Sequence, residues 1–260
     1  MRIVRTLVLP LLAATMLAAG CGTGDDGGGS TPEATKSQSP TEQLAASTKD
    51  LATRSHQYAL AADHFGATIA GSVDAPAKML SQKATLTIET LKITFDVANV
   101  GGQHYVKVAG IPVKGVTATK WQRIDTTKLT SIHVLLMNEI QDPTGAAAAI
   151  RCVVSAEKTG PQAYKGIMDL TKGGDGLPTV NQTDVAAMGD KGKAVPFEAA
   201  LDADGRLSTL KLSLPAYSDL DAGAVTITFS AFGAPVKVDA PPAGETVDAP
   251  PALYEFLNEN

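Results

Sequence analysis

Cysteine and aromatic residues are scarce in this chain of 260 residues, which contains two cysteines and 5% aromatic residues. A fold with so few cysteines must be stable without a framework of disulfides. Cys152 lies in the apolar run Ile150–Val154 with no histidine or basic cluster nearby, so we expect a buried structural thiol rather than a reactive one. With few aromatic side chains, the core must be built from Ala, Val, Leu and Ile.

Patterns that carry catalysis or metal binding are also missing from the sequence. The four histidines occur singly, without the i, i+4 pairing or the cysteine partners that a metal site needs. The sequence has no Gly-x-Ser-x-Gly nucleophile motif. Asp202-x-Asp204-Gly205 lies between two strand patterns and is interpreted as a hairpin turn rather than a calcium loop. We therefore expect no enzymatic activity, no catalytic residue, no metal and no cofactor.

Blocks of positive charge are absent as well. The formal net charge is −5, and the loss of Arg2 and Arg5 with an N-terminal signal makes it −7. An acidic chain without a basic cluster is a poor candidate for binding nucleic acid or an anionic lipid surface. We expect no nucleic-acid partner, and any attachment to a membrane must come from something other than charge.

What the N-terminus does contain is the pattern of a signal peptide. Two arginines in residues 1–5 precede an apolar run, Thr6–Leu17, and small residues before Cys21. That run is shorter than the roughly 20 residues that a membrane-spanning helix needs. Residues 17–21 resemble the lipobox of bacterial prolipoproteins, with Leu17 one place further out than the usual leucine. An ordinary secretory signal with a chance cysteine is the alternative.

The lipobox resemblance implies a domain order for the chain. Residues 1–20 are the signal peptide that is removed, and Cys21 then carries acyl chains such as palmitate, which place the protein on the outer face of the cell membrane. Residues 21–40 contain Gly, Ser, Thr and Pro with almost nothing apolar, and are predicted to be a flexible linker with a reach of roughly 25 Å. Residues 41–260 remain as one folded domain.

Two blocks of alternating apolar residues predict β-strands in this domain. A Gly101-Gly102 turn extends the first block, and Asp204-Gly205 is a strong hairpin signal within the second. Together they predict an antiparallel sheet of about eight to ten strands with one apolar face. The first block supplies Leu86, Ile88, Ile93, Phe95 and Val97, and the second supplies Phe197, Leu210, Leu212, Ile227 and Phe229.

Helical spacing of apolar residues appears in fewer places. It predicts a helix over Thr41–Arg54, a largely buried helix over Thr126–Gln141, and short helices over Pro143–Ile150 and Asp184–Met188. A C-terminal tail, Leu253–Leu257, is predicted to dock on the domain. The apolar face of the buried helix consists of Leu129, Ile132, Leu136, Met137 and Ile140.

A large sheet with few helices to cover it can enclose an apolar hollow or close into a barrel. Concave apolar pockets are the usual ligand sites, so the strand and helix residues named above are the candidate lining of a lipid-binding cavity. The alternation itself leaves a second interpretation equally open, in which the helices fill the space completely.

Several segments are similar to the actinobacterial LppX/LprA/LprF/LprG lipoprotein family. The similarity spreads over most of residues 41–250 and is closest in Phe229–Val238. Gly145–Ala149 departs from it, being less bulky than a covering helix requires, which favours a larger or more flexible cavity. The other similar segments are Lys120–Asp125, Asp142-Pro143, Tyr164–Leu170, Leu201–Leu207, Ala240–Pro242 and Val247-Asp248.

The resemblance implies an α+β fold, a twisted antiparallel half-barrel sheet wrapped around a few helices and similar to the lipoprotein carrier LolA. It implies a cavity that holds acyl chains of envelope lipids or lipoglycans and a role in carrying or chaperoning them. It supplies no catalytic residues. An envelope transporter is a candidate partner, and we expect a monomer. The alternative is a protein-interaction module or stress sensor on the same fold without lipid, as in RseB-like sensors.

Overall fold

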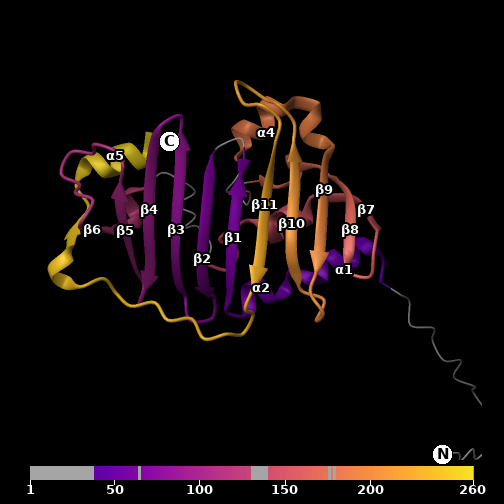
Figure 1. Cartoon of the computed structure of the whole chain (residues 1–260), viewed down its shortest axis with the longest axis horizontal. Helices are drawn as coiled ribbons and strands as arrows, with labels where there is room; N and C mark the ends of the chain where they lie inside the picture. Colours follow the sequence, from indigo (N-terminus) through magenta and orange to yellow (C-terminus); the bar gives the residue numbers. More distant parts are fainter. Residues whose placement is uncertain (1–37, 64–65, 130–139, 175–176, 178–179, 260) are drawn as a thin grey trace, which may run out of the picture. The chain divides into compact units, whose positions relative to one another are not determined.

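The computed structural model describes residues 38–63, 66–129, 140–174, 177 and 180–259. Residues 38–259 of this set belong to one compact unit. Within it, twelve strands form a single open sheet, and the helices are few and short (Figure 1). The predicted α+β class and the large sheet are confirmed.

The strand order is β12-β6-β5-β4-β3-β2-β1-β11-β10-β9-β8-β7, so two meanders join where β1 pairs with β11. Pairing is antiparallel throughout except between β12 and β6, which are parallel. The sheet exceeds the predicted strand number, partly because the three residues of β12 are too few to show alternation. The strands are β1 His56–Ala62, β2 Ala67–Asp74, β3 Met79–Ile88, β4 Leu91–Val100, β5 Gln103–Ala109, β6 Trp121–Ile124, β7 Val153–Lys158, β8 Ala163–Met168, β9 Val195–Leu201, β10 Leu207–Leu214, β11 Gly223–Ser230 and β12 Thr246–Asp248.

Register divides the strand residues between two faces. We call the face that buries Tyr58, Val97 and Ile227 the inner face, and the opposite face the outer face. In β1, for example, residues 56, 58, 60 and 62 are buried while Gln57 and Ala59 are exposed. Because side chains alternate along a strand, the register assigns paired residues to one face or the other. Register shifts interrupt the alternation in β10, between Leu207 and Thr209, and in β7, between Val153 and Ser155.

The predicted helix over Thr41–Arg54 is instead two helices, α1 (Pro40–Ser47) and α2 (Lys49–Thr53). The first begins earlier than expected, because Ser39 and Glu42 form a reciprocal capping box and Pro40 occupies the first helical position. Leu44 of α1 and Leu51 of α2 are buried in the core.

A helix starting at Thr126 is not observed, which corrects that prediction. The Asp125 side chain accepts the Thr127 N–H at 3.1 Å and caps a three-residue 3₁₀ turn, after which Leu129 is extended. Residues 130–139 lie outside the described residues. The short helix predicted from Pro143 is α3 (Ala146–Arg151), and its start is set by Asp142, whose carboxylate accepts the N–H groups of Ala147 and Ala148.

Local capping also shapes the chain on either side of β7 and β8. Cys152 is the C-cap of α3, and it is buried as expected, which raises the pKa of its thiol. Leu170 lies in a 3₁₀ turn that is capped by Asp169. The short helix predicted at Asp184–Met188 is confirmed as α4 (Gln182–Met188).

After β11 the chain leaves the centre of the sheet as an extended strap, residues 231–242. The strap runs along the lower ends of β1–β4 to the far edge, where β12 pairs with β6 (Figure 1). It leads to α5 (Pro251–Glu259), which buries Leu253 and Leu257. The predicted docking of the C-terminal tail is therefore confirmed. Among the described residues, no helix has both the length and the apolar character needed to cross a membrane.

Candidate functional site

The predicted site residues of β9, β10 and β11 form the packed core of the domain. Their side chains are almost fully buried on the inner face and belong to one hydrophobic cluster that also contains Leu44 of α1 and Ile150 of α3. Such residues define a rigid wall and expose little surface to a ligand. The members are Phe197, Leu210, Leu212, Ile227 and Phe229.

The predicted residues of β3 and β4 lie on the same inner face but are less uniformly covered. Ile93, Phe95 and Val97 are buried, whereas Leu86, which pairs with Ile93, is only half-buried against the core. Ile88 is the last residue of β3 and pairs with Leu91. The two meanders thus bring both predicted sets to one face of one sheet.

The remaining predicted residues are placed only in part. Leu129 and Ile140 are half-buried and pack against the hydrophobic core. Ile132, Leu136, Met137 and the predicted lipidation site Cys21 lie outside the described residues.

Four residues that the sequence analysis missed extend the half-covered region. Register places Ala67 opposite Leu86 and Ile69 opposite Ala84, all on the inner face. Leu91 follows on β4 with 46% of its surface exposed. The period of two in Ala67, Ile69 and Gly71 could have identified β2. We call the half-buried or exposed inner-face residues Ala67, Ile69, Ala84, Leu86 and Leu91 the inner apolar patch.

A buried polar pair borders this patch next to Ile69 and Ala84. Tyr58 reaches across Gly71 and donates its hydroxyl to Gln82 Oε1 at 2.6 Å. A side chain at position 71 would clash, because an added Cβ would lie 2.5 Å from the Tyr58 ring. Burial raises the pKa of Tyr58 well above its usual range, so the phenol stays protonated and remains a donor.

A second polar group lies on the inner face of β4–β6. His104 Nδ1 lies 3.0 Å from Asn99 Oδ1, and burial lowers the pKa of His104, so the neutral ring donates this bond. Asn99 Nδ2 and Gln122 Oε1 are buried and have no hydrogen-bond partner among the described residues. Buried polar atoms usually find a partner, so these two groups are available to a water molecule or to a polar ligand atom.

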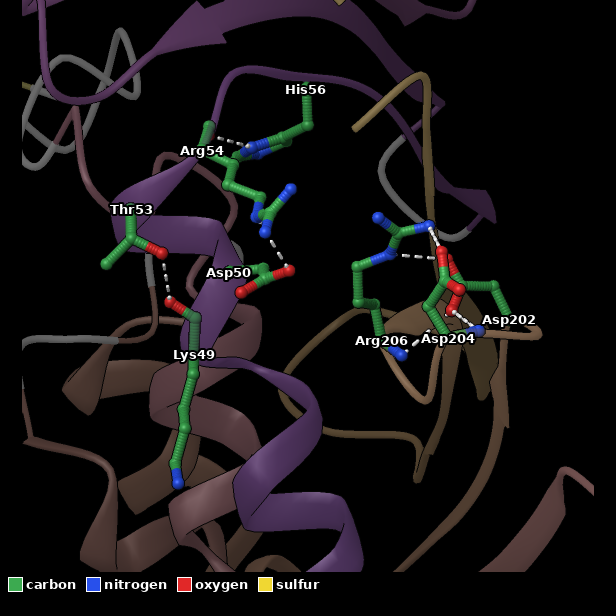
Figure 2. A network of polar contacts seen from close by, with 8 residues as sticks. All are labelled: Lys49, Asp50, Thr53, Arg54, His56, Asp202, Asp204 and Arg206. Atoms are coloured by element: carbon green, nitrogen blue, oxygen red, sulfur yellow. Dashed lines mark hydrogen bonds and ion pairs between the residues drawn. The ribbon is translucent and has the colours of Figure 1, made fainter. Parts of the chain in front are cut away.

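Figure 2 shows polar contacts at the start of β1 and in the turn that contains Asp202, Asp204 and Arg206. Arg54 pairs with Asp50 at 3.2 Å, and the Arg54 carbonyl lies 3.1 Å from His56 Nδ1. The His56 ring packs against Phe232 of the strap, with centroids 5.4 Å apart, and the Arg206 guanidinium covers the same Phe232 ring at 4.8 Å. These contacts fix the strap against the start of β1.

The hairpin turn predicted at Asp202–Gly205 is confirmed. Asp202 accepts the backbone N–H groups of Asp204 and Arg206 at 2.9 Å and pairs with the Arg206 side chain at 2.7 Å. The carboxylate is therefore used by the turn itself, in keeping with an Asx-type arrangement.

The described residues place an apolar, incompletely covered surface and two buried polar groups on the inner face of the sheet. Comparison with protein-family models finds no match for this chain, and no curated protein matches it.

Proposed function

We propose that this chain is a membrane-anchored lipoprotein that binds the acyl chains of envelope lipids or lipoglycans and carries or chaperones them. In this proposal the sheet is a half-barrel of the LolA type, attached to the outer face of the cell membrane through a lipid on Cys21. The observation that carries it is the inner apolar patch, in which Leu91 keeps 46% of its surface exposed although it belongs to the core-facing side of the sheet.

The patch has the chemistry that an acyl chain requires. Its members are Ala, Ile and Leu side chains, and it continues into the buried surface of Ile93 and Phe95. Burial contributes about 0.8 kcal/mol per CH₂ group, so a 16-carbon chain gains roughly 12 kcal/mol before ordering costs. Half of that gain would still retain the lipid during purification.

Filling the patch tests the proposal. Ala84→Phe places a ring beside Ile69 on the inner face, whereas Thr87→Phe places the same ring on the outer face of the same strand, at an exposed position outside the outer-face hollows. We expect native mass spectrometry of the full-length chain, expressed in a host with an actinobacterial envelope, to show bound lipid. Ala84→Phe should reduce the bound fraction by about tenfold, and Thr87→Phe should leave it unchanged.

Thermal unfolding of both variants controls for misfolding, since overpacking typically costs about 1–3 kcal/mol. A wild-type chain that remains free of lipid after incubation with an extract of envelope lipids would contradict the proposal. Equal lipid loading in the two variants would move the binding site away from the patch.

The second candidate is a protein-interaction module, and the edge of the sheet favours it. β7 is the terminal strand, and its Val154 is 56% exposed. Beside it, a hollow of about 500 Å³ on the outer face is lined by Ser155, Ile167 and Pro196. An exposed edge strand can pair with a partner strand. This candidate predicts that Val154→Lys abolishes binding of the partner protein, whereas Ala84→Phe leaves that binding intact.

A further inference from the structure

The outer face of the sheet carries a groove that the lipid-binding proposal does not use. Two hollows of about 630 and 420 Å³ open on this face. Both are lined by Ala59, Ala70, Lys83 and Thr228, so they form one continuous depression across β11, β1, β2 and β3. The inner apolar patch lies on the opposite face of β2 and β3.

The depression exists because the outer-face side chains at its centre are small. Ala59 pairs with Thr228 on one side and with Ala70 on the other. The adjacent row across the strands is Ser230, Gln57, Ser72 and Ser81, each directly opposite the next. These hydroxyl and amide groups each donate and accept hydrogen bonds. The groove therefore combines small apolar side chains at its centre with a row of uncharged polar groups beside them.

One wall of the groove is a short charge ladder that ends at an aromatic ring. Asp96 lies between two lysines, with Lys83 Nζ at 3.7 Å and Lys107 Nζ at 3.6 Å. Lys107 Nζ also lies 5.0 Å from the centroid of the Trp121 ring, which restrains the orientation of that ring. Trp121 is half-buried and lines the groove together with Asp96 and Lys83.

We propose that this groove binds a neutral saccharide. A sugar combines hydroxyl groups, which match the Ser, Thr and Gln side chains and the Asp96 carboxylate, with apolar C–H faces, which stack on an indole ring. An acyl chain would leave these polar groups unpaired. A peptide strand could not pair here, because the backbone groups of the central strands already bond within the sheet. The two lysines and the single Asp96 carboxylate leave the ladder with one net positive charge, which is little attraction for a polyanion.

The saccharide can come from two sources, a free envelope polysaccharide or the glycan headgroup of a lipid. Both present the same hydroxyl-rich chemistry, so the experiment uses each separately. The probes are lipid-free dextran, mannan and arabinogalactan in one arm, and deacylated glycolipid headgroups in the other. Because Trp121 is the single tryptophan of the chain, its fluorescence reports directly on this groove.

The titration uses the full-length chain in a detergent that has no sugar headgroup. We expect a saturable change in tryptophan emission with at least one probe. Ala70→Arg fills the groove floor, and Asp96→Asn removes a charged acceptor, so each should weaken binding by about tenfold. Ser213→Arg is the matched control, since Ser213 is exposed on the outer face of β10 outside the groove.

Absence of any saturable change with both classes of probe would overturn the inference, as would unchanged binding by Ala70→Arg. Saturation with polysaccharide alone or with headgroup alone supports it and identifies the source. Lipid loading measured on Ala70→Arg keeps the two proposals separate, because this variant should lose saccharide and retain lipid, whereas Ala84→Phe should do the reverse.

Discussion

Two titratable side chains, His56 and Asp142, are held where their charged forms are disfavoured. His56 is fully buried, and its Nε2 has no hydrogen-bond partner among the described residues. Burial lowers the pKa of His56, so protonation works against folding and stability decreases as the pH falls through about 6.5. Burial raises the pKa of Asp142 to about 6, which gives the opposite dependence.

Replacing Asp142 isolates its part of the pH dependence. Between its usual value near 3.8 and about 6, the folded state holds more protons on this residue than the unfolded state does, so the free energy of unfolding falls as the pH rises. Asp142→Asn keeps an oxygen for the Ala147 and Ala148 N–H groups and removes the charge. We expect it to stabilise the protein by about 1–3 kcal/mol at pH 7.

At pH 4 the carboxyl is protonated in the folded state and partly protonated in the unfolded state, so most of the stability difference between the variant and the wild type should disappear. Denaturant unfolding of the two proteins at pH 4 and pH 7 measures the difference. A stability difference that is the same at both pH values would show that Asp142 acts through packing or capping and not through its charge.

At the scale of elements, the Tyr58 side chain crosses β2 and connects β1 to β3. The ring occupies the space above Gly71 and ends on Gln82 of β3, so three strands share one buried contact. Glycine inside a strand often marks such a close approach. The strap is anchored in a similar way, by hydrogen bonds from the Gly233 N–H to the Ser55 carbonyl at 2.8 Å and from Ser55 Oγ to the Ala234 carbonyl at 2.7 Å.

Gly71→Ala should therefore destabilise the sheet although it adds only a methyl group. The new Cβ would lie 2.5 Å from the Tyr58 ring, which must move and lose its bond to Gln82. We expect a loss of about 1–3 kcal/mol in the free energy of unfolding. Gly244→Ala is the control, because its Cβ meets no atom within 4 Å. Equal stability of the two variants in denaturant unfolding would contradict this account.

At the scale of the whole molecule, the proposed function depends on a lipid that attaches a folded domain to a membrane. The two cysteines make this testable, since the sequence predicts acylation of Cys21 and a buried thiol at Cys152. Two or three acyl chains on one residue suffice for stable anchoring, at about 0.8 kcal/mol per buried CH₂.

Cys21→Ser should abolish incorporation of an alkyne-labelled palmitate in cells and move the chain out of the detergent-rich phase. Cys152→Ser should retain both the label and the partitioning, because its Sγ is enclosed in the core and lies 3.4 Å from the Ala148 carbonyl oxygen. Palmitate labelling that persists in Cys21→Ser would contradict the predicted anchor.

Much of the sheet could be predicted because alternation is a local property. The positions of Phe95, Phe197 and Ile227 on one apolar face follow from a period of two, and the Asp204-Gly205 hairpin follows from its turn residues. Helix starts were less predictable, since α1 depends on a capping box at Ser39 and a 3₁₀ turn replaces the expected helix start at Thr126.

The sequence by itself determined which side of each strand is apolar, because side-chain direction depends only on position along the strand. The tertiary structure decided which apolar residues are core and which stay exposed. The pairing of β1 with β11 joins residues more than 160 positions apart in the sequence. Ile227 of β11 is buried, whereas Leu91 of β4 stays exposed to solvent. The outer groove likewise arises only when Ala59, Ala70 and Lys83 from separate strands are brought into register. The depth of the groove depends on the side chains of neighbouring strands, which are distant in the sequence and leave no local pattern.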